Sequence, residues 1–127
     1  MSIETVRLNG RARNQLITLK RRTGIENWNI LCRWAFCASL AEDHAPRPGS
    51  AGGEAAIEMT WRTFGGEYAD VYLGLLKQHN LEHDLGTDDQ SLQEQLKLHL
   101  HRGIGYLASK KDFTSVEQLL NIGESTA

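Results

Sequence analysis

The spacing of apolar residues divides the chain into two short strands and a series of helices. Residues 4–8 alternate polar and apolar side chains, as a half-buried strand does. Residues 56–64 alternate again, which favours a second strand near 57–64. Apolar residues three and four apart predict helices over 11–22, 28–41, 67–79 and 92–108, and a short last helix that starts at Asp112 or Thr114 and runs to about Asn121.

Several residues at the predicted helix ends have the chemistry of caps. Gly24 suits the left-handed position that ends a helix, and Asn27 can cap the next one. Ser91, with Glu94 three residues later, predicts a capping box at the start of the helix over 92–108. Near its end, Gly103 and its neighbour Gly105 either allow close packing or break the helix.

The same periodicity predicts which faces are buried. The helix over 28–41 is apolar around most of its circumference, so we expect it to be largely buried. Its two cysteines, Cys32 and Cys37, are interpreted as small buried apolar residues. The helix over 67–79 is expected to turn one apolar face inward, made of Tyr68, Val71, Tyr72, Leu75 and Leu76.

These elements predict a single compact, mainly α domain over 1–127 with a short N-terminal strand. It has a basic strand-helix-helix part over about 3–41, a loop over 43–53 that holds both prolines, and a helical part over 54–122. No apolar run is long enough to span a membrane, and residues 1–5 have no signal-peptide character. We therefore expect a cytoplasmic protein.

The net charge of -2 hides a strong asymmetry along the chain. Residues 1–34 carry seven Lys/Arg and two Asp/Glu, a balance of +5, whereas residues 49–127 carry six and twelve, a balance of -6. A chain polarised in this way can present a basic face to phosphates although it is acidic overall. The candidate DNA-binding residues are Arg7, Arg11, Arg13, Lys20, Arg21, Arg22 and Arg33.

The order strand, basic helix, glycine turn and apolar helix over 4–41 resembles a ribbon-helix-helix DNA-binding unit. In that unit two chains pair their short strands, because a lone strand leaves its backbone groups without partners. This interpretation implies at least a dimer. The alternative is a helical hairpin whose arginines form an ordinary solvated face.

Other candidate chemistry is weaker. His79 and His83 are four apart, as zinc ligands on a helix are, but solvent-exposed histidines are the preferred interpretation. Glu67 and Asp70 are three apart and could hold a divalent metal, although acidic residues also favour a helix start. Trp34 and Trp61 each adjoin an arginine and could stack on bases if exposed. The pattern therefore predicts no catalytic residue, metal or cofactor.

Two runs of sequence resemble the DndE family of the DNA sulfur modification (phosphorothioation) system. They are Leu19-Lys20-Arg21-Arg22-Thr23-Gly24-Ile25 and Trp61-Arg62-Thr63-Phe64-Gly65-Gly66-Glu67-Tyr68-Ala69-Asp70, within a similarity over about 3–124. The resemblance implies a homo-oligomer, expected to be a tetramer, that binds double-stranded DNA and prefers nicked duplex. It also implies partner proteins: a cysteine desulfurase, an ATP-pyrophosphatase-like subunit and an SMC-like ATPase. It gives no catalytic motif, and it maps the basic surface onto Lys20, Arg21 and Arg22.

The leading hypothesis from the sequence is thus a non-catalytic DNA-binding accessory subunit. One alternative is a protein-protein adaptor that assembles the modification complex through its acidic C-terminal part. Another is a metal-dependent DNA nicking enzyme that uses Glu67 and Asp70.

Overall fold

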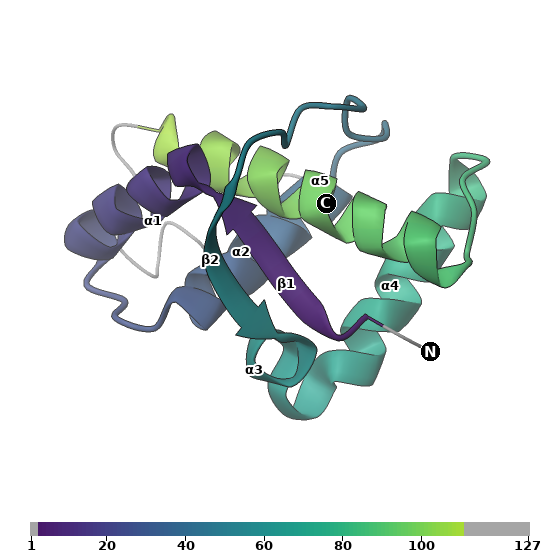
Figure 1. Ribbon diagram of the computed structural model, residues 1–127, viewed down its shortest axis with the longest axis horizontal. Coiled ribbons are helices and arrows are strands. Elements are labelled where there is room, and N and C mark those ends of the chain that lie inside the picture. The colour runs from purple at the N-terminus through teal and green to yellow at the C-terminus, as the bar shows by residue number, and fades with distance from the viewer. Residues whose placement is uncertain (1–2, 111–127) are drawn as a thin grey trace.

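The computed structural model describes residues 3–110, and most of these lie in helices (Figure 1). The mainly α fold and its N-terminal strand are confirmed. The predicted last helix, from Asp112 or Thr114 to Asn121, lies outside the described residues. The elements in chain order are β1 (Thr5–Asn9), α1 (Gly10–Thr23), α2 (Trp28–Leu40), β2 (Ala55–Thr60), α3 (Trp61–Gly65), the 3-10 turn η1 (Gly66–Tyr68), α4 (Ala69–Glu82) and α5 (Asp89–Ala108).

The two strands form one antiparallel sheet within the chain. Val6 lies opposite Met59, and Arg7 lies opposite Glu58. Val6 and Leu8 are buried, so the predicted alternation along β1 is confirmed. The sequence-based argument that β1 needs a second chain is wrong, because β2 supplies the missing backbone partners.

The boundaries of α1 agree with the expected cap chemistry. The Asn9 side chain accepts a hydrogen bond from the Ala12 N–H at 2.9 Å, which fixes the start of the helix. Gly24 ends it with φ 74°, a conformation that costs glycine little. Asn27 does occupy the cap position of α2, but its side chain makes no capping hydrogen bond.

The second strand is shorter than the alternation suggested. It ends at Thr60, whose hydroxyl accepts a hydrogen bond from the Thr63 N–H at 3.0 Å and so starts the short helix α3. The part of the predicted strand after residue 60 is therefore wrong. The residues after Thr60 fit both a strand and a helix, because Trp61 continues the alternation and also lies three residues before Phe64. The Thr60 cap favours the helix.

The start of α5 is also different from the prediction. Asp88, and not Ser91, is the cap: its carboxylate accepts from the Ser91 N–H at 3.2 Å and from the Ser91 hydroxyl at 2.6 Å. The anionic side chain is the better cap, because it also interacts favourably with the positive end of the helix dipole. The helix then continues through Gly103 without a break.

Gly103 lies at the contact between α2 and α5, the most extensive contact between described elements. A Cβ atom at this position would lie only 1.8 Å from the Ala35 carbonyl oxygen. Close packing is therefore the correct one of the two interpretations of this glycine. The main chains of the two helices touch there, and the buried face of α2 joins the core through Leu31, Ala35 and Phe36.

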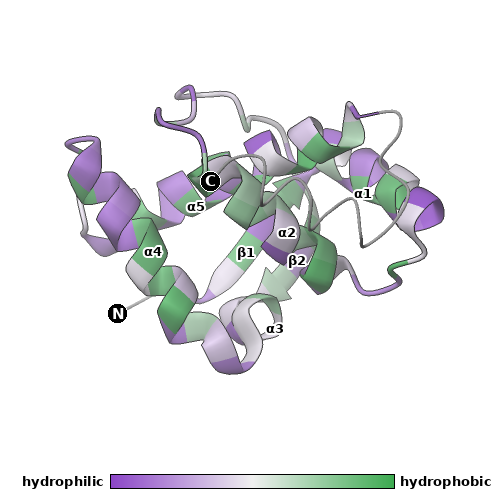
Figure 2. Ribbon diagram, turned by 180° about the vertical axis from the view of Figure 1, so that it is seen from behind, coloured by the Kyte–Doolittle hydropathy of each residue, from purple (hydrophilic) through white to green (hydrophobic). Residues whose placement is uncertain are grey.

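The predicted inward face of α4 is confirmed only for Leu76 and, in part, for Tyr72. The buried apolar residues of α4 are Leu73 and Leu76, and Tyr72 is half-buried. Tyr68, Val71 and Leu75 are instead 59%, 55% and 41% exposed. In Figure 2, α4 carries several green, hydrophobic segments. We call Tyr68, Val71 and Leu75 the α4 ridge.

The remaining predictions on burial have mixed outcomes. Cys32 is buried as expected, whereas Cys37 is exposed on the outer side of α2. Residues 43–53 contain no helix or strand, which confirms the loop. No described helix is long and apolar enough to cross a membrane.

Candidate nucleic-acid interface

A row of three open cavities, which we call the trough, lies along α5; the second and third share lining residues, and the first is separate. The other wall of the trough is β1 and then α1, both of which contact α5 (Figure 1). The cavities have volumes of about 560, 320 and 730 Å³ in order along α5. The lining residues of α5 extend from Gln90 to Ala108, so the trough is about 30 Å long.

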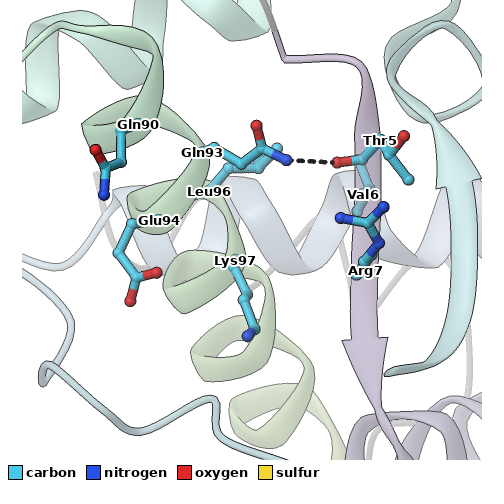
Figure 3. Close-up of a pocket in the computed structure, with 8 residues that line it drawn as sticks. All are labelled: Thr5, Val6, Arg7, Gln90, Gln93, Glu94, Leu96 and Lys97. Atoms are coloured by element: carbon cyan, nitrogen blue, oxygen red, sulfur yellow. Dashed lines mark hydrogen bonds between the residues drawn. The ribbon is translucent and has the colours of Figure 1, made fainter. Parts of the chain in front are cut away.

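The first cavity lies between β1 and the first half of α5 (Figure 3). The Gln93 side-chain amide donates to the Thr5 carbonyl at 3.3 Å, which satisfies one backbone group on the edge of β1 away from β2. Arg7 and Lys97 supply two cations to the lining, and Glu94 supplies one carboxylate. This end of the trough is thus only mildly positive.

The middle cavity has the highest density of positive charge. Arg11 of α1, Arg47 of the 43–53 loop and Arg102 of α5 all line it, beside His101. The other lining residues are neutral: Asn9, Ala12, Gln15, Ser50 and Gly105. Since no carboxylate is among these described lining residues, the cations can face an anion such as phosphate.

The third cavity continues the trough between α1 and the end of α5. It shares Arg11, Gln15 and Gly105 with the middle cavity, and Asn14 and Thr18 add polar groups. Neutral hydrogen-bonding groups beside a cationic centre are typical of surfaces that contact the DNA backbone.

The predicted residues of α1 lie on two sides of the helix. Arg11 faces α5 across the trough, and Arg22 donates from its guanidinium to the Ala108 carbonyl at 3.0 Å. Arg13 and Lys20 are seven residues apart and so share the other side, and Arg21 is exposed between the two sides. The structure therefore brings Arg11 into the lining of the trough, holds Arg22 against the end of α5, and leaves the other three on the outer surface of α1.

The remaining two predicted residues make internal contacts. The Arg7 Nε donates to the Glu58 carboxylate on β2 at 2.6 Å. Arg33 is half-buried and donates to the carbonyls of Thr63 and Phe64, which ties α2 to α3. Neither guanidinium is as available to a ligand as that of Arg11.

Three residues of the middle cavity were missed by the sequence analysis: Arg47, His101 and Arg102. Arg47 lies in the loop, where no local charge pattern marks it. His101 and Arg102 lie in a basic stretch over 95–111 that the acidic balance of the C-terminal part hid. Arg102 also has a structural role, since it donates to the Ser39 side chain and carbonyl and to the His44 carbonyl. Only the fold places these residues beside α1.

The expectation of solvent-exposed histidines is wrong for His79, which is 6% exposed, and His99 beside it is 0% exposed. Their rings meet edge to face, with centroids 4.6 Å apart. His83 stacks on His79, and both His83 ring nitrogens face carbonyl oxygens, those of His79 and Asp43. These carbonyls raise the pKa of His83, that of Asp43 most, because both nitrogens must carry a proton to donate.

The weaker candidates gain little support from the fold. Within residues 3–110, no three His, Cys, Asp or Glu side chains converge on a possible metal position. Glu67 and Asp70 are both exposed near the start of α4. Trp61 is buried and contacts Phe64, and Trp34 is half-buried, so neither is an open platform for a base.

Comparison with known proteins places this geometry in a family. The model of the DNA sulphur modification protein DndE matches residues 5–115. The chain resembles the crystal structure of DndE from Escherichia coli B7A, which is involved in DNA phosphorothioation modification. The TM-score is 0.68 with 24% identity over 84% of this chain and 98% of that one.

A second similar structure is a double glycine-to-lysine mutant of DndE involved in DNA phosphorothioation. It has a TM-score of 0.62 and 21% identity, and it covers 84% of this chain and 98% of that one. No curated protein matches the sequence. Because the family model covers most of the residues, the chain belongs to the DndE family of DNA sulphur modification proteins.

Proposed function

We propose that this protein is a DNA-binding accessory subunit of the DNA phosphorothioation system, and that it holds duplex DNA along the α1–α5 trough. The observation that carries the proposal is the middle cavity, where Arg11, Arg47 and Arg102 converge from three separate segments without a carboxylate among the described lining residues. The trough is about 30 Å long, close to the length of one turn of B-DNA. Arg13, Lys20 and Arg21 lie on the outer surface of α1, outside the trough, and add positive charge near it without lining it.

A preference for nicked duplex has a physical basis in this arrangement. Arg11 and Arg47 are exposed and Arg102 is half-buried deeper in the middle cavity, so a duplex that bends or opens locally can bring its phosphates closer to all three. A nick lowers the cost of that deformation. The contacts available are guanidinium, amide and hydroxyl groups, which read the backbone and not the base sequence.

The proposal assigns no reaction to this chain. The trough offers hydrogen-bond donors and positive charge, which position DNA, and the sulphur chemistry then belongs to partner proteins. Those proposed by family resemblance are the cysteine desulfurase, the ATP-pyrophosphatase-like subunit and the SMC-like ATPase. Self-association into a tetramer would place several troughs on one assembly.

The test is DNA binding by the variant Arg11→Ala/Arg47→Ala. We expect binding to a short nicked duplex to weaken by about tenfold or more, and the slope of log K against log salt to decrease by about two, because two phosphate contacts are lost. Fluorescence anisotropy at two salt concentrations measures both. The matched control is Arg62→Ala/Lys77→Ala, which removes two exposed charges from α3 and α4. If both variants bound the duplex as tightly as the natural protein, the trough would not be the DNA-binding site.

A further variant, Lys20→Ala/Arg21→Ala, separates the outer surface of α1 from the trough. Both residues are exposed, so the substitutions should leave the fold intact. Arg22 is kept, because its contact with the Ala108 carbonyl would confuse loss of a cation with loss of packing. A larger loss of affinity here than in Arg11→Ala/Arg47→Ala would move the DNA site to the outer surface.

A second candidate function is an adaptor that holds another protein of the system. The α4 ridge favours it, since three adjoining exposed apolar residues are typical of protein-binding surfaces. Capture of the system's ATPase after nuclease treatment, lost in Val71→Ser/Leu75→Ser and retained in Arg11→Ala/Arg47→Ala, would establish this function.

A further inference from the structure

His101 connects the trough to the junction between β1 and α1. It lies on the wall of the middle cavity and is half-buried. Its Nδ1 lies 2.7 Å from the Lys97 carbonyl oxygen, and its Nε2 accepts a hydrogen bond from the Asn9 N–H at 3.1 Å. Asn9 is also the residue that caps α1.

These two contacts assign one protonation state to the ring. The Lys97 carbonyl can only accept, so Nδ1 carries a proton, and the Asn9 N–H can only donate, so Nε2 carries none. His101 is therefore neutral in the structure described. A proton added to Nε2 removes the acceptor of the Asn9 bond, and the ring must then turn toward another acceptor.

The surroundings of His101 oppose its protonation while the trough is empty. Burial and the Lys97 ammonium lower its pKa, although the Lys97 carbonyl has the opposite effect. The charged side chains that share the cavity are Arg102 from α5, Arg11 from α1 and Arg47 from the loop, and all are positive. The facing residue of β1, Asn9, is uncharged.

We infer that DNA binding in the trough is coupled to proton uptake by His101, which becomes a further cationic contact to phosphate. The inference rests on the proposed function. Phosphates that reach the middle cavity neutralise the three arginines and supply a new acceptor for Nε2–H. Both changes favour the imidazolium, so DNA and the proton must strengthen each other's binding by the same factor. Mildly acidic conditions then tighten the complex.

The experiment compares affinity for a short nicked duplex at about pH 6 and about pH 8, at one salt concentration. Because a single proton is taken up, affinity can rise by no more than about tenfold for each unit that the pH falls. We expect affinity at about pH 6 to be about three- to tenfold higher than at about pH 8. His101→Gln should abolish this pH dependence, since a glutamine side chain can still accept from the Asn9 N–H but cannot gain charge. His44→Gln, which changes an exposed histidine outside the lining, is the matched control.

A direct readout in the natural protein is the NMR titration of the His101 ring with and without duplex. A pKa that rises on addition of DNA supports the coupling, and this measurement does not depend on a variant. The inference is overturned if His101→Gln keeps the pH dependence of the natural protein, or if DNA leaves the pKa of His101 unchanged. The proposed function still stands in that case if Arg11→Ala/Arg47→Ala loses affinity. If no variant and no pH changes the binding of duplex, the proposed function and the inference both fail.

Discussion

The two sides of α5 differ in how their polar groups are satisfied. Toward β1 and α1, Gln93 and His101 each bond to a backbone group. Arg102 bonds to the Ser39 hydroxyl and carbonyl on α2 and to the His44 carbonyl in the following loop. Toward α4, the only bond to an imidazole nitrogen of His79 or His99 is that of His99 Nδ1 with the Ser39 hydroxyl. The other three nitrogens, both of His79 and Nε2 of His99, are buried and make no hydrogen bond of normal geometry with the described residues, although the Glu42 backbone lies close enough to His79 to oppose the lowering of its pKa by burial.

This difference indicates two levels of local stability. A buried polar group without a hydrogen bond costs free energy that a satisfied group does not. The trough half, made of β1, α1 and the side of α5 that faces them, should therefore be rigid. The α4 half, made of α4 and the side of α5 toward it, should open more readily. Three predictions test this contrast, from the largest expected effect to the smallest.

Gly103→Ala should have the largest effect, because it forces α2 and α5 apart where their main chains touch. The new Cβ would meet three backbone atoms of Ala35 within 3 Å, so side-chain rearrangement cannot relieve the clash. We expect the free energy of unfolding to fall by more than about 3 kcal/mol. Urea unfolding followed by circular dichroism measures it.

The control is Gly74→Ala on α4, where an added Cβ meets nothing within 4 Å. The gain in helix propensity should stabilise it by up to about 1 kcal/mol. Similar losses of stability at the two glycines would show that the α2–α5 contact is not more rigid than α4.

Leu76→Ala should cost about 2 to 3 kcal/mol, and the loss should be confined to the α4 half. Leu76 is fully buried, whereas its neighbour Leu75 lies on the exposed ridge, so Leu75→Ala should cost less than about 1 kcal/mol. Hydrogen exchange should become faster in α4 and stay slow in α2 and α5. Global loss of protection in Leu76→Ala would contradict the contrast between the two halves.

Acid should weaken the α4 half more than the trough half, because two imidazoles with a lowered pKa, His79 and His99, lie there, compared with one, His101, in the trough. Burial lowers the pKa of His99 to about 3, and burial also lowers that of His79. The unfolded chain binds protons at these sites from about pH 6.5 downward while the folded chain does not. Each imidazole therefore reduces the free energy of unfolding as pH falls below about 6.5, by at most about 1.4 kcal/mol per pH unit.

The measurement is hydrogen exchange at about pH 7 and about pH 5, corrected for the intrinsic rate. The dependence should shrink in His99→Gln and persist in His44→Gln, which alters an exposed ring. If acid speeds hydrogen exchange in α1 and β1 more than in α4, the buried imidazoles are not the cause of the loss of stability.

Local patterns predicted the elements that local chemistry determines. The alternation over 4–8, the cap at Gly24 and the helical spacing in α1 all depend on neighbours in sequence, and the structure agrees with them. Periodicity could not choose the buried face of α4, because apolar residues surround most of that helix. Leu73 and Leu76 form one stripe, and Val71 and Leu75 form another. Only contact with α5 and α3 decides between them.

The candidate site was predictable only in part, for a similar reason. Arg11 and Arg22 were found because they belong to a basic run, and the fold does bring both to α5. Arg47 comes from a loop of neutral net charge, distant from α1 in sequence. His101 lies in a basic stretch, residues 95–111, which holds four Lys/Arg and no Asp or Glu, but the balance of -6 over 49–127 hid this local signal. Their proximity follows from the packing of α5 against the β1–α1 junction, which no short-range pattern encodes.

The ion pair between Arg7 and Glu58 also affects how quickly DNA would find this surface. With Nε and Oε1 2.6 Å apart, the two charges act at long range as a dipole, whose field falls off faster than that of a single charge. Arg7 can therefore contribute to a complex once formed and add little to the attraction that guides an approaching duplex. The rate of encounter would instead be governed by the exposed cations of α1, such as Arg13 and Arg21.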